Sequence, residues 1–251
     1  MRIQYCSDLH LEFEKNNSYI LKNPLKIEGE ILILAGDIVP LHDEFLIYSF
    51  FDYISDNFEM VYWVLGNHEF YYNDLKNYKS NSKIKIRENI FVVNNCNILY
   101  KGVNFLFSTL WSKISKENEK IIEQRVADFD LILFGGKKIK AHTVNKLHKS
   151  SLNFLENELN LNKNKTVVVT HHVPSKLCNM ESYNNSEINE AFCVELTDFI
   201  KKSNANFWIY GHSHYNQKPL FIGNTVLLTN QLGYVNLNEN INYRNNAFFS
   251  I

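Results

Sequence analysis

The sequence has no long apolar run, no excess of charge of either sign and few cysteines. A membrane-spanning helix needs about 20 consecutive apolar residues, and no stretch approaches that length. Lysine and arginine together number 26, against 27 aspartates and glutamates, whereas proteins that bind long nucleic acids usually carry a clear positive excess. We therefore expect neither a membrane protein nor an extended nucleic-acid surface.

The four cysteines, Cys6, Cys96, Cys178 and Cys193, form no CxxC pair and no zinc-ribbon spacing. They are typical of free thiols in a reducing compartment. The chain opens on a segment with strand character and without the features of a signal peptide. These observations predict a cytoplasmic protein.

The chain has 251 residues, of which 45% are hydrophobic and 14% aromatic. This length allows one large domain or two small ones, with a sizeable core. No internal repeat and no linker divides the sequence, so we expect a single domain over residues 1–251.

Five short apolar segments are each followed by a polar residue with metal-binding chemistry. They are rich in β-branched and aromatic residues, which is typical of strands buried on both faces. The segments and the residues after them are Arg2–Cys6 with Ser7-Asp8, Ile31–Ala35 with Gly36-Asp37, Val61–Leu65 with Gly66-Asn67, Thr166–Val169 with Thr170-His171, and Asn206–Tyr210 with Gly211-His212.

Helical patterns lie between the strands, and this alternation predicts an α/β fold with a largely parallel core sheet. The expected helices are Glu44–Phe58, His142–Leu159 and Glu190–Lys202.

A hairpin around Lys101-Gly102 and three strands near the end of the chain predict a second, more antiparallel sheet packed on the first. These strands are Asn97–Tyr100, Val103–Thr109, Lys218–Ile222, Thr225–Thr229 and Asn246–Ile251. Three further stretches have the character of loops or insertions: Tyr71–Asn89, Ser112–Lys140 and Ser175–Asn189.

The position of the polar residues is informative. In an open α/β sheet, ligands bind beside the carboxyl ends of the strands, and five predicted strands deliver Asp, Asn or His there. Carboxylate oxygens, an amide oxygen and imidazole nitrogens suit divalent ions of Mn, Fe, Zn or Ni. The sequence therefore predicts a metal site at the carboxyl ends of these strands.

The five motifs resemble those of the calcineurin-like metallophosphoesterase family, in the family's order and over almost the whole chain. Each motif is weakly specific alone, whereas the full set is specific. They are Asp8-Leu9-His10, Gly36-Asp37, Gly66-Asn67-His68-Glu69, His171-His172 and Gly211-His212-Ser213-His214. The resemblance implies a four-layer αββα sandwich, in which helices flank two packed mixed β-sheets and the metal site lies at the strand carboxyl ends.

The resemblance also implies a role for each motif residue. Ligands of a first metal would be Asp8, His10 and His214, and ligands of a second would be Asn67, His171 and His212. Asp37 would bridge the two ions. His171 is preferred over the adjacent His172 because the family places its ligand at the first histidine after the strand.

Two ions about 3.5–4 Å apart can share a water and lower its pKa, and the resulting hydroxide would attack phosphorus in line. His68 matches the family histidine that protonates the leaving oxygen or stabilises the transition state, since imidazole titrates near neutral pH. The alternative for His68 is a hydrogen bond to a backbone carbonyl and nothing more.

Three features depart from the family pattern or add little to it. Pro40 stands where the family often has an acidic residue or Asn, which leaves the tuning of Asp37 open. The loop Asn230–Tyr234 resembles a family loop but lacks its proline, and a turn beside the site is favoured over substrate contact. For the loop aromatics Phe70, Tyr71 and Tyr72, packing is favoured over stacking on a substrate.

The resulting hypothesis is a metal-dependent hydrolase of small phosphate esters, preferably a phosphodiesterase. The alternatives are a phosphomonoesterase or phosphatase, and a binding scaffold without catalysis, which the filled ligand positions disfavour. Two divalent ions are expected as cofactors, with Mn²⁺ first and Fe, Zn or Ni as alternatives. Substrate-binding residues and oligomeric state are not predicted.

Overall fold

Both faces of the central strands are buried, which explains why the strands are apolar throughout. In the computed structural model, which describes residues 1–41, 45–161 and 164–251, side chains alternate between two sides of each strand. Ile31 and Ile33 pack between two sheets, whereas Leu32 and Leu34 pack toward the outer layer. Residues 166–169 alternate in the same way, with Val168 facing outward.

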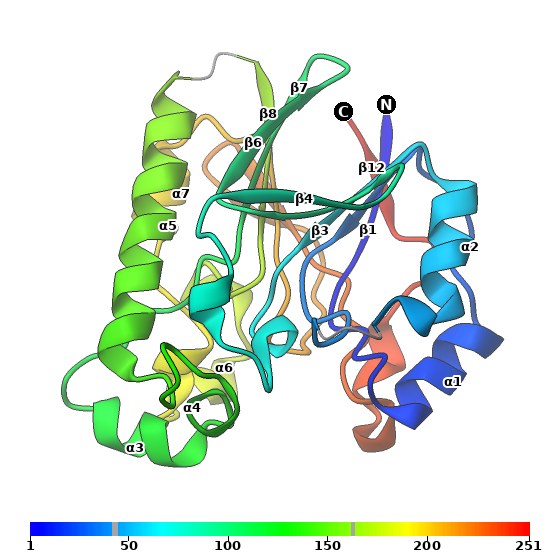
Figure 1. Ribbon diagram of the computed structural model, residues 1–251. Coiled ribbons are helices and arrows are strands. Elements are labelled where there is room, and N and C mark those ends of the chain that lie inside the picture. Colours follow the sequence, from blue (N-terminus) through cyan, green and yellow to red (C-terminus); the bar gives the residue numbers. More distant parts are fainter. Residues whose placement is uncertain (42–44, 162–163) are drawn as a thin grey trace.

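The architecture is a sandwich of two six-stranded mixed sheets with helices on both outer faces (Figure 1). The first sheet has the order β12 (Phe248–Ser250), β1 (Arg2–Cys6), β2 (Ile31–Leu34), β3 (Met60–Val64), β5 (Ile90–Asn94) and β4 (Ser82–Arg87). The second has the order β10 (Leu220–Ile222), β11 (Thr225–Leu228), β9 (Phe207–Ile209), β8 (Lys165–Thr170), β7 (Val103–Ser108) and β6 (Cys96–Tyr100). The predicted αββα class is therefore confirmed.

The two sheets have the same pattern of strand directions. In each, three parallel pairings are flanked by one antiparallel pairing at either edge. The expectation of a more antiparallel second sheet is wrong, because β8 pairs in parallel with both β7 and β9 in that sheet, and β9 pairs in parallel with β11. The motif-bearing strands are thus divided between the sheets.

Helices cover each outer face through their apolar stripes. On the first sheet lie α1 (Glu14–Lys22) and α2 (Ser49–Asn57), and on the second lie α5 (Ala141–Leu161) and α7 (Thr197–Lys202) (Figure 1). The predicted helix His142–Leu159 is confirmed as α5. Of the predicted helix Glu44–Phe58, Glu44 lies outside the described residues, and Phe45–Ile47 forms a separate short 3-10 turn before α2.

The predicted helix Glu190–Lys202 is too long at its start. A short 3-10 turn spans Asn189–Ala191, and α7 begins only at Thr197. The residues between them pair with Val173, whose N–H donates to the Phe192 carbonyl and whose carbonyl accepts from the Val194 N–H. This backbone pairing satisfies the groups that a helix would otherwise use.

The three stretches expected as loops contain regular structure. The first contains β4, in which Ser82–Arg87 pairs antiparallel with β5. The second contains α3 (Glu119–Arg125) and α4 (Asp128–Leu131), and the third contains α6 (Glu181–Asn184). These three short helices gather at the end of the sandwich opposite the chain termini (Figure 1).

No helix among the described residues is long and apolar enough to span a membrane. All four cysteines are free thiols, and Cys6, Cys178 and Cys193 are buried.

Candidate metal centre

The predicted ligands lie on loops whose backbone is locally strained. Five of the seven have φ in the left-handed region, between 47° and 76°, where side-chain-bearing residues are uncommon. Such conformations cost about 1–3 kcal/mol each and persist where the surrounding structure fixes them, often at functional sites. The five are Asp8, His10, Asp37, His212 and His214.

Two glycines allow the loops to approach one another closely. A Cβ at Gly66 would overlap Asp37 Oδ1 and lie 2.8 Å from the His171 ring. A Cβ at Gly36, whose φ is +91°, would overlap the same imidazole. The glycines of the Gly-Asp and Gly-Asn motifs therefore make room for the side chains of their neighbours.

Residues from both sheets form a first group of ligand atoms. Asp8 and His10 follow β1, and His214 follows β9. His10 Nε2 lies 3.0 Å from His214 Nε2, and His214 Nε2 lies 3.5 Å from Asp8 Oδ1. These three side chains bring one ligand atom each into a space that suits a metal ion.

A second group lies next to the first. His171, which follows β8, points its Nε2 at Asn67 Oδ1 (3.0 Å), His212 Nδ1 (3.0 Å) and Asp37 Oδ2 (3.3 Å). The same Asp37 oxygen lies 3.9 Å from His10 Nε2. Asp37 therefore stands between the two groups, in the position that the sequence prediction gives to a bridging carboxylate.

The hydrogen bonds behind the imidazoles show that these groups fit cations. His10 Nδ1 faces Glu12 (3.3 Å) and His214 Nδ1 faces Glu239 (2.6 Å), so each Nδ1 carries the proton. The two Nε2 atoms then face each other with lone pairs. His171 Nδ1 likewise donates to the Ala35 carbonyl at 2.9 Å, which turns a lone pair toward Asp37 and Asn67. In these tautomers the Nε2 lone pairs of the three rings turn toward the side-chain oxygens of Asp8, Asp37 and Asn67, an arrangement that a positive ion would satisfy.

His172 lies beside the centre but takes no part in either group. Its Nδ1 lies 3.1 Å from the Thr109 carbonyl, and its ring lies between Trp111 and His212, with centroid distances of 5.4 and 4.2 Å. Burial and the neighbouring His171 lower the pKa of His172 to about 3. His172 thus supports the His212 ring as a neutral side chain.

Glu69 connects the loops after β2 and β3. Its buried carboxylate accepts hydrogen bonds from the backbone N–H groups of Asp37 (2.9 Å), Ile38 (2.7 Å) and Gly66 (2.5 Å), and from Trp63 Nε1 (3.0 Å). Burial, together with the charge of Asp37, raises the pKa of Glu69 to about 7. The Glu of the GNHE motif is therefore a structural organiser of the centre.

The carboxylate beside His68 comes from Glu12, which the sequence prediction missed. Glu12 Oε1 lies 3.1 Å from His68 Nδ1, and the same oxygen faces His10. Burial lowers the pKa of His68, but the nearby Asp37 and Glu12 outweigh it, so that the pKa is raised. The acidic partner of His68 therefore comes from the loop after β1.

Asp128 is a second acidic residue that the prediction missed. Its Oδ1 accepts from Asn67 Nδ2 and from the Tyr71 hydroxyl, both at 2.8 Å. The bond from Nδ2 turns the Asn67 amide oxygen toward His171. Tyr71 also stacks on His68 with centroids 4.0 Å apart.

The remaining aromatic residues after the GNHE motif point elsewhere. Phe70 is buried and stacks on Trp111, with centroids 5.8 Å apart, and Tyr72 is exposed. Packing therefore explains Phe70, whereas Tyr71 belongs to the centre.

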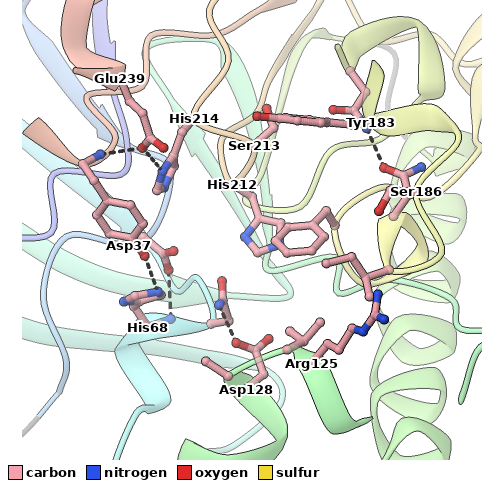
Figure 2. Close-up of a pocket in the computed structure, with 18 of the residues that line it drawn as sticks. Asp37, His68, Arg125, Asp128, Tyr183, Ser186, His212, Ser213, His214 and Glu239 are labelled. Atoms are coloured by element: carbon pink, nitrogen blue, oxygen red, sulfur yellow. Dashed lines mark hydrogen bonds and ion pairs between the residues drawn. The ribbon is translucent and has the colours of Figure 1, made fainter. Parts of the chain in front are cut away.

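A cavity of about 430 Å³ opens from the centre toward the inserted helices. Asp37, His68, His212 and His214 lie at its inner side, while Arg125, Tyr183 and Ser186 face them across the space (Figure 2). Val126, Ile188 and Phe192 add apolar surface to the lining, and Phe192 stacks on His212 with centroids 5.0 Å apart. The second and third insertions therefore build the outer wall.

Comparison with known proteins agrees with this geometry. Residues 1–216 match the family model described as calcineurin-like phosphoesterase. The chain is 33% identical over 268 residues to a protein of Acanthamoeba polyphaga mimivirus named L509, covering 96% of this chain and 95% of that protein. The chain therefore belongs to the calcineurin-like phosphoesterase family. It is a metal-dependent phosphoester hydrolase by that membership.

Solved structures show the same fold at low sequence identity. The phosphopantetheinyl hydrolase of Mycobacterium tuberculosis superposes with a TM-score of 0.67 at 19% identity, covering 92% of this chain and 89% of that one. The protein TT1561 of Thermus thermophilus superposes with a TM-score of 0.50 at 14% identity, covering 92% and 88%.

His171→Ala and His172→Ala test which histidine holds metal. We expect His171→Ala to weaken binding of one ion by at least about tenfold, because a ligand atom is lost, while His172→Ala keeps both ions. Elemental analysis after Mn²⁺ loading and desalting measures this. Equal loss in both variants would contradict the assignment.

Glu12→Gln tests whether this carboxylate orients His10 and His68. We expect turnover to fall about 10- to 100-fold, because the amide cannot accept from both Nδ1–H groups as a charged partner does. Steady-state kinetics of the metal-loaded enzyme measures the change. Glu88→Gln, at a surface residue whose side chain is 92% exposed, is the control, and unchanged kinetics in Glu12→Gln would show that Glu12 has no such role.

Proposed function

We propose that this protein is a phosphodiesterase that hydrolyses diesters of small organic alcohols and uses two divalent ions, with Mn²⁺ as the resident metal. The observation that carries the proposal is the scarcity of cations around the cavity. Arg125 is the one Lys or Arg among the described lining residues, and its side chain is 61% exposed and pairs with Glu187 at 3.6 Å.

This lining favours a diester over a monoester. A phosphate monoester carries close to two negative charges and is commonly held by several Arg or Lys side chains. A diester carries one charge and a second organic group, which needs space and apolar contact. Val126, Ile188 and Phe192 supply that contact in the cavity lining.

The residues of the centre divide the chemistry between them. Bound divalent ions would neutralise the phosphoryl oxygens and lower the pKa of water. Asp8, His10 and His214 would hold one ion, Asn67, His171 and His212 the other, and Asp37 both. The carboxylates Glu12, Glu239 and Asp128 keep these side chains oriented.

His68 is the proposed proton donor to the leaving alcohol. It lines the cavity, and its backbone N–H donates to Asp37 Oδ1 at 2.9 Å. With Nδ1 facing Glu12, the opposite nitrogen Nε2 is the one available to the ester. No side chain of this chain needs to form a covalent bond to phosphorus.

The structural neighbour described as a phosphopantetheinyl hydrolase suggests one class of ester to include among the substrates. A phosphate that carries a long, uncharged organic arm would use the apolar outer wall.

Bis(4-nitrophenyl) phosphate and 4-nitrophenyl phosphate distinguish the two reactions. We expect kcat/KM to be at least about tenfold higher for the diester, which corresponds to about 1.4 kcal/mol of transition-state discrimination. Activity should disappear with a chelator and return with Mn²⁺. Asp37→Asn is the control for contaminating enzymes and should be inactive on both. A preference for the monoester would indicate a phosphatase, and no metal-dependent turnover of either would contradict an enzyme.

His68→Ala should keep both ions and lower diester turnover by about 100-fold, because the leaving oxygen loses its proton donor. The loss should be larger for phenyl than for 4-nitrophenyl esters, since phenolate is the poorer leaving group. Metal content and kcat for both esters are the measurements. Loss of metal from this variant would make His68 part of the ligand set instead.

A further inference from the structure

Tyr234 lies in the centre although the family match ends before it. The family model covers residues 1–216, whereas Tyr234 belongs to the loop after β11. Its side chain lines the cavity together with Asp37, His68 and His214. The sequence favoured a simple turn at this loop, and the structure brings its last residue to the reacting end of the cavity.

The backbone on both sides of Tyr234 is firmly held. Asn16, which is fully buried on α1, donates to the Gly233 carbonyl (2.8 Å) and accepts from the Val235 N–H (3.1 Å). The Tyr234 N–H donates to Glu239 Oε2 at 2.7 Å, and the same oxygen faces His214 Nδ1. One carboxylate thus fixes a predicted metal ligand and Tyr234 together.

The ring of Tyr234 is also fixed. Its centroid lies 4.8 Å from that of His10, 4.6 Å from that of His214 and 5.5 Å from that of Phe13. A tyrosine has few rotatable bonds, so this packing determines where the hydroxyl lies. A hydroxyl placed in advance loses little entropy when it binds a ligand.

The Tyr234 hydroxyl lies next to His68, the proposed proton donor. It lies 3.4 Å from His68 Nε2, which is its one hydrogen-bond partner among the described residues. With Nε2 carrying the proton that His68 would donate, the hydroxyl oxygen can only accept from it, and the hydroxyl hydrogen is free to reach a bound ligand. A phenol keeps its proton at neutral pH and can donate it.

We propose that Tyr234 is a further catalytic residue, whose hydroxyl donates a hydrogen bond to a non-bridging phosphoryl oxygen beside His68. This inference rests on the proposed phosphodiesterase function. It is also consistent with the scarcity of Lys and Arg in the cavity lining, because a neutral hydrogen-bond donor at the inner side of the cavity can stabilise the single negative charge of a diester. The hydroxyl keeps its own proton throughout, so no bond of Tyr234 is made or broken.

Tyr234→Phe removes the hydroxyl and keeps the ring against His10 and His214. We expect unchanged metal content, a fall in kcat/KM for bis(4-nitrophenyl) phosphate of about 100-fold, as for loss of one transition-state donor, and a Kd for inorganic phosphate raised about tenfold in calorimetry of the Mn²⁺-loaded protein. Tyr53→Phe, whose hydroxyl donates to the Leu25 carbonyl away from the cavity, is the control and should match the wild type in all three.

The outcomes separate this inference from the proposed function. Wild-type turnover with an unchanged Tyr234→Phe variant would overturn the role of the hydroxyl and leave the phosphodiesterase standing. Absence of wild-type turnover would contradict the phosphodiesterase, and the phosphate Kd would still decide for or against Tyr234. Loss of metal from Tyr234→Phe, or a loss of function seen only when Tyr234→Leu removes the ring, would show that Tyr234 merely packs.

Discussion

The centre depends on a buried carboxylate that is not among its predicted ligands. Glu69 accepts four hydrogen bonds and so ties the loop after β2 to the loop after β3. Asp37 and Asn67 are positioned by these two loops, and the left-handed backbone of Asp37 persists because its N–H is held. A buried carboxylate with several donors is stable, whereas the same donors without it would be left unsatisfied in the interior. Hydrogen bonds to Glu69 therefore hold the backbone of the two loops that carry Asp37 and Asn67.

Besides Glu69, three further carboxylates lie next to the predicted metal ligands. Glu12, Glu239 and Asp128 each accept from a ligand side chain and so determine which atom turns inward. The centre is therefore rich in lone pairs and negative charge. It would attract cations and repel a phosphate group to which no metal ion is bound. At the inner side of the cavity His68 and Tyr234 lie together, with the Tyr234 hydroxyl 3.4 Å from His68 Nε2.

Local patterns carried most of the fold prediction. The motif strands could be predicted because burial on both faces leaves an apolar segment that stops at a polar residue, and the position of each ligand candidate follows from that stop. The orienting carboxylates could not be predicted, because Glu12 and Asp128 meet their partners His68 and Asn67 across 56 and 61 positions of sequence. The helix expected from Glu190 failed for a related reason, since distant Val173 pairs with its first residues. For β4 a local signal did exist, in the alternation of lysine and isoleucine over Lys83–Ile86.

Each group of ligand atoms draws on both sheets, since Asp8, His10, Asp37 and Asn67 come from the first and His171, His212 and His214 from the second. An ion in either group would consequently crosslink the two sheets. It would do so at the carboxyl ends of the strands, beyond the apolar core that joins the sheets elsewhere. Ligands that bind only the folded state add to its stability in proportion to the logarithm of their concentration. The concentration of available metal ions would thus affect the stability of the packing between the two sheets as well as the catalytic activity.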